Sequence, residues 1–227
     1  MHFDAILDRL QKSGKNVFTV YDISKLMGKS TPYASLMLSK SKKVKRIERG
    51  KYFLNDTSIY EIASNIIFPS YVSLQAGLQY YNLIDQAVVK YSVISLKRHK
   101  KILVSGNQIE FIFTVKKLFF GYLNKSGAYI ASPEKAVIDS IYFGGIKFST
   151  LKDAVETAIN EQNIDVKKLI EYAIKTESRV LASKLGFMLD LLGIKNEQLI
   201  PYKYYNYIKI SGTGMHGTNK KWMINYD

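Results

Sequence analysis

The amino-acid sequence predicts an α+β protein in which three short helices and a basic hairpin come first, followed by a mixed α+β region with an antiparallel sheet and several helices. Three observations predict this order. Apolar residues recur at helical spacing up to about residue 40, two basic strand-like runs follow, and the rest of the chain contains both strand and helix periods. We expect a domain of residues 1–58 and a second domain of residues 59–227.

The composition is typical of a globular protein. Of the 227 residues, 47% are hydrophobic and 23% charged, and no apolar run approaches the ~18 residues of a membrane span. Asp4, Asp8 and Arg9 interrupt the apolar residues at the N-terminus, which favours an amphipathic helix over a signal peptide. The chain has no cysteine, and its three histidines lie far apart in the sequence. We therefore expect a cytoplasmic protein with no cofactor, no metal and no membrane partner.

The first two helices follow from spacing and from their end signals. Apolar residues from Phe3 to Leu10 predict a helix that ends at Ser13-Gly14. A short β-prone run follows at residues 17–19. Asp22 is then expected to cap a second helix, which ends at Gly28.

The third helix and the hairpin complete this part of the chain. Ser30 or Thr31, followed by Pro32, predicts a helix start, and the helix reaches about residue 39. Residues 44–48 and 51–54 are strand-like runs joined at Arg49-Gly50. Three short helices and a basic hairpin are the layout of a winged helix-turn-helix, so we assign residues 1–58 to a DNA-binding domain.

Positive charge is concentrated in this segment. The chain has 33 Lys and Arg against 19 Asp and Glu, a net charge of +14, and residues 1–56 hold half of the excess. Between residues 40 and 51, seven basic residues face only Glu48. A field of this sign attracts nucleic acid. A generally lysine-rich composition would also produce a basic surface, and the same layout also serves as a protein-interaction module.

We expect the partner to be double-stranded DNA, because an α-helix fits the major groove and a basic hairpin can lie along the flanking phosphates. The first turns of the third helix are expected to reach base edges, and the basic residues to contact the backbone. The candidate base-reading residues are Ser30, Thr31, Tyr33 and Ser35. The candidate backbone contacts are Lys40, Lys42, Lys43, Lys45, Arg46, Arg49 and Lys51.

The second region begins with helices and continues with strands. Ser58 and Glu61 form a capping box that predicts a helix ending before Pro69, and Ser73 starts another helix that ends near Asn82. Alternating apolar residues between 88 and 115, with Gly106-Asn107 as a two-residue hairpin turn, predict an antiparallel sheet.

Helical periods return after the strands. Ser132-Pro133-Glu134 predicts a helix start, with Ala136, Val137 and Tyr142 or nearby apolar residues on the buried face. Residues 149–192 carry helical patterns throughout. Glu134 is interpreted as a charge that favours the helix start.

Two basic segments allow more than one interpretation. The run at residues 97–101, which contains His99, can touch phosphates but is more typical of a solvated turn. Tyrosines and lysines alternate between residues 202 and 209, a composition that can stack on bases. A strand with tyrosines packed at its edges is the more common explanation of that pattern.

Two motifs resemble catalytic signatures but lack their context. Gly212, Gly214 and Gly217 have dinucleotide-binding spacing, yet only ten residues follow, too few for the required helix and strand. Asp165-Val166-Lys167 has the acid-x-lysine pattern of some metal-dependent nucleases, with Asp153 upstream, but it lies in a helical period. We expect no catalytic residues and no enzyme activity.

Several longer strings resemble one family. They are LSKSKKVKRIERGKYFL at 38–54, PSYVSLQAGLQYYNLI at 69–84, ASPEKAVIDSIYF at 131–143, LASKLGFMLDLLGI at 181–194 and KKWMINYD at 220–227. Together they resemble the AbiEi antitoxins of type IV toxin–antitoxin (abortive infection) systems, over nearly the whole chain.

The resemblance implies a function for each part. The winged helix would bind inverted repeats in the protein's own promoter and repress transcription, and the C-terminal domain would counteract a cognate nucleotidyltransferase-type toxin. A transcription regulator without a toxin partner is the first alternative, and a metal-dependent DNA nuclease is the second. The protein is expected to be a monomer or a homodimer.

Overall fold

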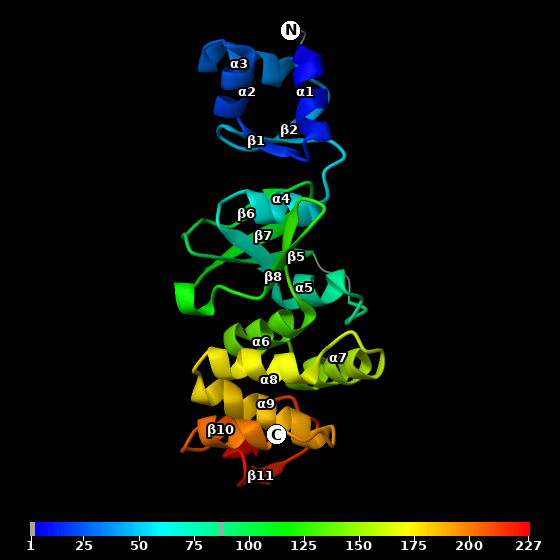
Figure 1. Ribbon diagram of the computed structural model, residues 1–227, viewed down its shortest axis with the longest axis vertical. Helices are drawn as coiled ribbons and strands as arrows, with labels where there is room; N and C mark the ends of the chain where they lie inside the picture. The colour runs from blue at the N-terminus through cyan, green and yellow to red at the C-terminus, as the bar shows by residue number, and fades with distance from the viewer. Residues whose placement is uncertain (1–2, 87–88) are drawn as a thin grey trace.

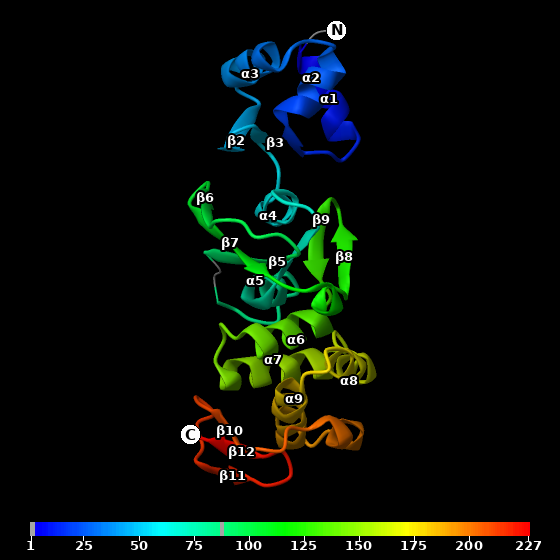
Figure 2. The ribbon, with the colours of Figure 1, turned by 90° about the vertical axis from the view of Figure 1, so that its left-hand side faces the viewer.

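The computed structural model describes residues 3–86 and 89–227 and has a mixed α+β fold. The chain forms an elongated stack of three layers, which follow one another in sequence order from top to bottom (Figures 1 and 2). Three helices and a small sheet lie at the N-terminal end, a larger sheet lies in the middle, and a helical layer with a second small sheet lies at the C-terminal end. Within the described residues, no helix is long and apolar enough to cross a membrane.

The N-terminal layer contains the predicted three helices and hairpin. Its apolar core is formed by one side of each helix together with residues of the sheet, including Ile6, Ile23 and Leu38. The three strands are antiparallel in the order β1-β3-β2. The elements are α1 (Phe3–Lys12), β1 (Val17–Thr19), α2 (Val20–Met27), α3 (Thr31–Lys40), β2 (Val44–Glu48) and β3 (Lys51–Leu54).

The start of α2 differs from the prediction by one turn. Asp22 is not the cap, because the helix begins at Val20 and Thr19 precedes it. The Asp22 backbone N–H donates to the Thr19 hydroxyl at 3.3 Å, and the Thr19 N–H donates to the Asp22 carboxylate at 2.7 Å. This reciprocal pair is a capping box, which satisfies two backbone donors at once. Gly28 ends the helix as predicted, with a positive φ of 61°.

The middle layer is built on a six-stranded sheet in the order β6-β7-β5-β4-β9-β8. Successive residues of each strand point to opposite faces. Val72 and Val93 pack with α4 on one face, whereas Tyr71 and Ile94 pack with α5 and α6 on the other. The elements are α4 (Ile59–Asn65), β4 (Ser70–Ser73), α5 (Leu74–Tyr80), β5 (Lys90–Ser95), β6 (Ile102–Val104), β7 (Asn107–Phe113), the 3₁₀ helix η1 (Lys116–Leu118), β8 (Tyr122–Lys125) and β9 (Ala128–Ala131).

The prediction of an antiparallel sheet is wrong for part of this layer. β5 pairs with β7 in parallel, as β4 does with β9, so the sheet is mixed. Alternation of apolar residues reports a strand but not the direction of its neighbour, which depends on the path of the connection. The hairpin between β6 and β7 turns at Ser105-Gly106, one residue earlier than predicted, and both residues have positive φ.

The C-terminal layer contains four helices and a three-stranded sheet in the order β10-β12-β11. Trp222 is completely buried against α9, and its indole N–H donates to Asp190 at 2.6 Å. Gly186 makes room for it, because a Cβ at that position would lie 2.4 Å from the indole ring. The elements are α6 (Pro133–Phe143), α7 (Phe148–Asn160), α8 (Val166–Lys175), α9 (Arg179–Leu191), the 3₁₀ helix η2 (Glu197–Tyr202), β10 (Ile208–Ile210), β11 (Gly217–Asn219) and β12 (Ile224–Tyr226).

Helix α6 joins the middle and C-terminal layers and is buried along most of its length. Lys135 and Asp139 form an ion pair at 2.5 Å, and both side chains are only 1% exposed. The hydroxyls of Ser73 and Tyr71 donate to the second carboxylate oxygen at 2.7 and 3.1 Å. Of the buried face predicted for this helix, Ala136 and Val137 are buried, and so is the nearby apolar Ile141, whereas Tyr142 is exposed.

Candidate nucleic-acid interface

A groove of about 570 Å³ lies between α3 and the β2–β3 hairpin. Thr31 and Ser35 line it from α3, and Arg46 and Arg49 line it from the hairpin. The remaining lining residues are Val20 and Tyr21 of α2, Pro32 of α3, Gly50 of the hairpin turn and Tyr52 of β3. Residues far apart in the sequence therefore meet along one side of the N-terminal layer.

The sequence of α3 explains which of its side chains face outward. Ala34 and Leu38, four residues apart, are buried against α1 and α2 and fix the orientation of the helix. Tyr33, Ser35 and Leu36 then point away from the core and are exposed. The helix starts as predicted at Ser30, which has extended backbone and is followed by Thr31 and Pro32.

The hairpin brings its two arginines to the groove through local backbone features. Gly50 has a φ of 78° in the turn, a conformation that favours glycine. The register shifts between Arg46 and Glu48, which marks a bulge in β2. Arg46 Nε donates to the Glu48 carbonyl oxygen at 3.1 Å across this bulge. Bulges bend a strand and redirect its side chains, and both Arg46 in β2 and Arg49 in the turn line the groove.

The basic residues of this segment divide into two groups. Lys43 faces α1, where its ammonium lies 3.8 Å from Asp4 and 3.5 Å from Asp8. Lys51 points toward the middle layer, where it donates to the Ile66 carbonyl oxygen at 2.6 Å. In the part of the chain that the structure describes, no acidic side chain lies within 4.0 Å of the charged groups of the others, which are Lys40, Lys42, Lys45, Arg46 and Arg49.

Glu48 connects the hairpin to the middle layer. Its carboxylate lies 2.9 Å from Lys51 Nζ and 3.2 Å from His99 Nε2. Partial burial opposes its ionisation, but these two partners outweigh burial and lower the pKa of Glu48. The hairpin is therefore held against the loop that precedes β6.

His99 is more enclosed than the predicted solvated turn. Its side chain is 15% exposed and packs edge-on against Phe111, with ring centroids 4.7 Å apart. His99 Nδ1 lies 2.7 Å from the Lys100 carbonyl oxygen, so both ring nitrogens face acceptors. A second contact between the N-terminal and middle layers joins Asn16 to α4, where Asn16 donates to both oxygens of Glu61 at 3.0 and 3.1 Å. Burial raises the pKa of that carboxyl group.

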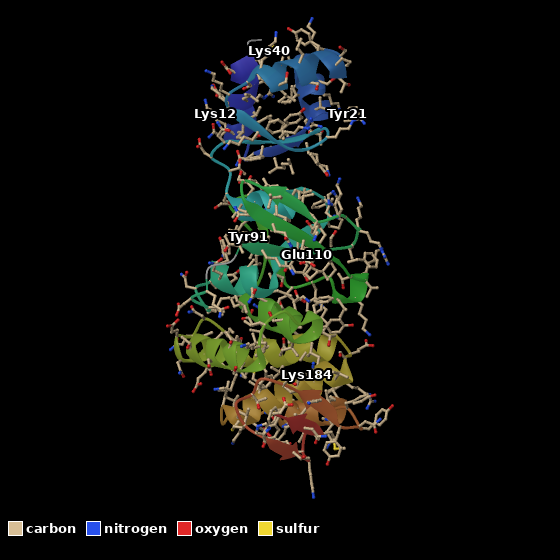
Figure 3. The ribbon with its side chains drawn as sticks, turned by 180° about the vertical axis from the view of Figure 1, so that it is seen from behind. Lys12, Tyr21, Lys40, Tyr91, Glu110 and Lys184 are labelled. Atoms are coloured by element: carbon tan, nitrogen blue, oxygen red, sulfur yellow. The ribbon has the colours of Figure 1, made fainter. Side chains whose placement is uncertain are left out.

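Two exposed residues of the N-terminal layer, Tyr21 and Leu36, were not among the predicted site residues. Tyr21 lines the groove and is 72% exposed, and Leu36 on α3 is 48% exposed. Figure 3 places Tyr21 and Lys12 on opposite sides of the N-terminal layer, with Lys40 at its outer end. Tyr21 does not share the helical spacing of the buried residues Val20 and Ile23 in α2. This spacing could have predicted from the sequence that Tyr21 is exposed.

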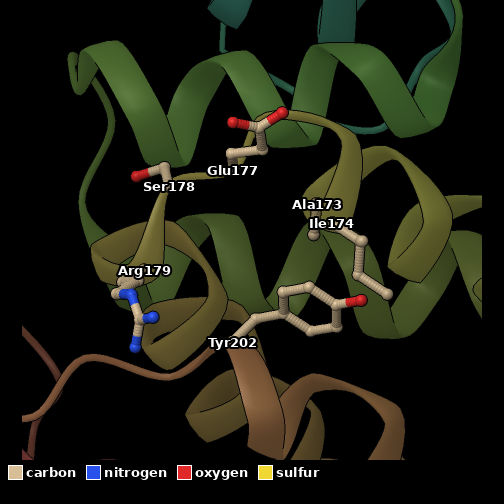
Figure 4. A pocket seen from close by; sticks show the side chains of 6 residues that line it. All are labelled: Ala173, Ile174, Glu177, Ser178, Arg179 and Tyr202. Atoms are coloured by element: carbon tan, nitrogen blue, oxygen red, sulfur yellow. The ribbon is translucent and has the colours of Figure 1, made fainter.

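A second hollow, of about 290 Å³, lies between α8, the start of α9 and η2. Figure 4 shows the Tyr202 ring beside Ile174, with Arg179 at the other end and Glu177 above. The predicted strand with packed tyrosines is wrong here, because residues 203–207 have no regular secondary structure and Tyr205 is exposed. The conformation of residues 203–207 follows from contacts with α9 and not from strand propensity. The Tyr204 N–H donates to the Ser183 hydroxyl of α9.

The motifs with a catalytic appearance have structural roles. Asp165 precedes α8, and one of its oxygens accepts the backbone N–H groups of Lys167 and Lys168 at 2.8 and 3.4 Å. Asp165 is therefore a helix cap. Gly212 and Gly214 have positive φ in the connection between β10 and β11. Among residues 3–86 and 89–227, no three His, Cys, Asp or Glu residues are grouped to hold a metal ion.

Comparison of the chain with protein-family models and with curated proteins finds no match.

Proposed function

We propose that residues 1–58 form a winged helix-turn-helix and that the protein binds double-stranded DNA through the groove between α3 and the hairpin, as a repressor of transcription. One observation carries the proposal. Thr31, Pro32 and Ser35 of α3 line the same groove as Arg46 and Arg49, and no acidic side chain of the described residues forms an ion pair with either arginine. Such a surface supplies both groups that duplex recognition needs, a helix for the major groove and cations for the phosphates.

The groove suggests a division of labour within the interface. In the major groove, Tyr33 and Ser35 on the first turns of α3 read base edges. Arg46 and Arg49 contact phosphates, because one guanidinium group can donate two parallel hydrogen bonds to the oxygens of one phosphate. Lys43 and Lys51 are not part of the proposed interface, since Lys43 pairs with Asp4 and Asp8 on the surface of α1 and Lys51 donates to the Ile66 carbonyl oxygen.

The test is duplex binding by the full chain as a function of salt. We expect the affinity for DNA from upstream of the gene to fall steeply with salt concentration, because each phosphate contact releases counterions. Replacing Arg49 by alanine should weaken binding to this DNA and to random DNA alike, and should reduce the slope of log affinity against log salt by about 1. Replacing Tyr33 by alanine should instead reduce the preference for the upstream DNA.

Lys195→Ala provides the matched control, because Lys195 is an exposed cation in the C-terminal layer. It removes the same charge and should leave the salt slope unchanged. If Arg49→Ala and Lys195→Ala had the same effect, general attraction to a basic protein would explain the binding. If the full chain bound no duplex at low salt, the proposed function would be wrong.

We extend the proposal with the resemblance to AbiEi antitoxins. Residues 59–227 would then form an effector domain that counteracts a toxin, and repression would act on the protein's own promoter. An Arg46→Ala, Arg49→Ala double variant should lose repression but still protect cells from the toxin encoded by the adjacent gene. If the folded double variant lost both activities, a plain transcription regulator would be the better description.

A further inference from the structure

The outward face of α3 lacks the side chains that distinguish guanine and adenine. Arginine or lysine recognises guanine through two hydrogen bonds, and asparagine or glutamine recognises adenine in the same way. None of these residue types occurs in α3 before Lys40, its last residue. The exposed residues before Lys40 are Pro32, Tyr33, Ser35, Leu36 and Ser39.

Three of these exposed residues are apolar or aromatic and lie on one face of the helix. Leu36 follows Pro32 by four positions and Tyr33 by three, so the three side chains are neighbours. Tyr33 and Leu36 are 45% and 48% exposed. Pro32 also lines the groove, as does the exposed Tyr21. The apolar strip is therefore continuous with the groove that contains Arg46 and Arg49.

The chemistry of this strip matches one feature of duplex DNA. The thymine C5 methyl is the apolar group that base pairs present in the major groove. We propose that α3 recognises thymine methyl groups through Tyr33 and Leu36, while Arg46 and Arg49 hold the backbone. The preferred ligand is then a duplex with thymines at adjacent positions of the major groove. This inference rests on the proposed DNA-binding function.

The test removes only the methyl groups. An alternating A·T duplex of about 30 base pairs, roughly three helical turns, is compared with the same duplex made with deoxyuridine. Burial of a methyl-sized group contributes ~0.8 kcal/mol, or about fourfold in affinity. With two apolar side chains each covering a methyl group, the thymine duplex should bind about fifteenfold more tightly. Inosine–cytosine duplexes with and without 5-methylcytosine provide the reciprocal comparison, in which adding the methyl should strengthen binding.

A protein variant assigns the effect to α3. Leu36→Ser should reduce the preference for thymine over deoxyuridine about fourfold while the salt slope stays unchanged. Leu103→Ser is the matched control, because Leu103 is also an exposed leucine but lies on β6. It should keep the full preference.

The outcomes separate the two proposals. Equal, salt-dependent binding of the thymine and deoxyuridine duplexes would overturn methyl recognition and leave DNA binding in place. A thymine preference that survives in folded Leu36→Ser would overturn the assignment to α3. Absence of binding to every duplex would overturn the proposed function itself, and the apolar strip would then be a surface for another protein.

Discussion

Helices α3 and α6 begin alike but occupy different surroundings. Both start with a serine in extended backbone followed closely by a proline, and they have 10 and 11 residues. Helix α3 buries one side and exposes the other, whereas α6 is buried from Glu134 to Ile141. The comparison shows that a start signal fixes where a helix begins but not how many of its sides are covered, which depends on the elements packed around it.

The charged residues of the two segments have correspondingly different roles. Around α3 and the hairpin, Arg46 and Arg49 face an open groove. In α6, the charges of Lys135 and Asp139 are turned toward each other, and the Lys135 ammonium also lies 4.4 Å from the centre of the Phe120 ring. Burial lowers the pKa of Lys135 and raises that of Asp139, and their contact opposes both shifts. Charge is open to solvent in one region and is paired inside the protein in the other.

The largest predicted effect comes from breaking the pair in α6. Asp139→Ala leaves the ammonium of Lys135 buried without its partner, and it removes the acceptor of Ser73 and Tyr71. We expect a loss of about 3–5 kcal/mol in the free energy of unfolding, measured by urea denaturation. Replacing both members, with Lys135→Met and Asp139→Leu, should cost far less. A loss below about 1 kcal/mol for Asp139→Ala would mean that the pair behaves like a surface ion pair.

The second largest effect is expected from a variant that adds volume to the C-terminal layer instead of removing a buried charge. Gly186→Ala would place a methyl group 2.4 Å from the Trp222 ring, so the ring or α9 must shift. We expect a loss of about 1–3 kcal/mol in thermal or urea unfolding. Gly77→Ala is the matched control, because its Cβ would lie 3.3 Å from the nearest atom. Equal effects at both positions would contradict close packing around Trp222.

A smaller loss of stability is expected when the helix cap at the start of α2 is removed. Thr19→Ala removes the hydroxyl that accepts the Asp22 N–H at the start of α2. We expect a loss of about 1 kcal/mol in the free energy of unfolding, as for other helix caps. Ser39→Ala removes an exposed hydroxyl from the end of α3 and should change stability less. If the two variants were equally stable, the capping box would contribute nothing measurable.

The smallest effect concerns the contact between the two regions. The pKa of Glu48 is lowered in the folded protein, so its ion pairs contribute stability above its ordinary value of 4.5 and lose it as the pH falls. Glu48→Gln should therefore reduce the free energy of unfolding by at most about 1 kcal/mol near pH 7. The difference from the unchanged protein should shrink below about pH 4. A difference that is the same at both pH values would contradict the role of this carboxylate.

Much of the fold was predictable from local patterns. The three helices and the hairpin of residues 3–54, the helices α6 to α9, and the start of α5 after Ser73 agree with the predicted segments. These elements have apolar residues at a regular spacing and recognisable end signals. The groove residues Thr31, Ser35, Arg46 and Arg49 were also among the predicted site residues, and the structure brings them together.

The features that were missed depend on contacts between distant segments. The parallel pairing of β5 with β7, the internal position of Lys135, and the pairing of Lys43 with α1 and of Lys51 with the middle layer are set by the packing of whole layers. A lysine has the same sequence signature whether it faces a phosphate, a carbonyl oxygen or an aspartate. Charge counts along the hairpin therefore overstate the cations that face the groove.

Trp222 is the single tryptophan of the chain, and it is enclosed in the C-terminal layer with its indole N–H bonded to Asp190. Its fluorescence therefore reports on that layer alone, since the N-terminal and middle layers contain tyrosine and phenylalanine but no tryptophan. Far-ultraviolet circular dichroism reports on all three layers. Coincidence of the two signals during unfolding would show one cooperative transition, and separation would show that the C-terminal layer unfolds independently of the rest of the protein.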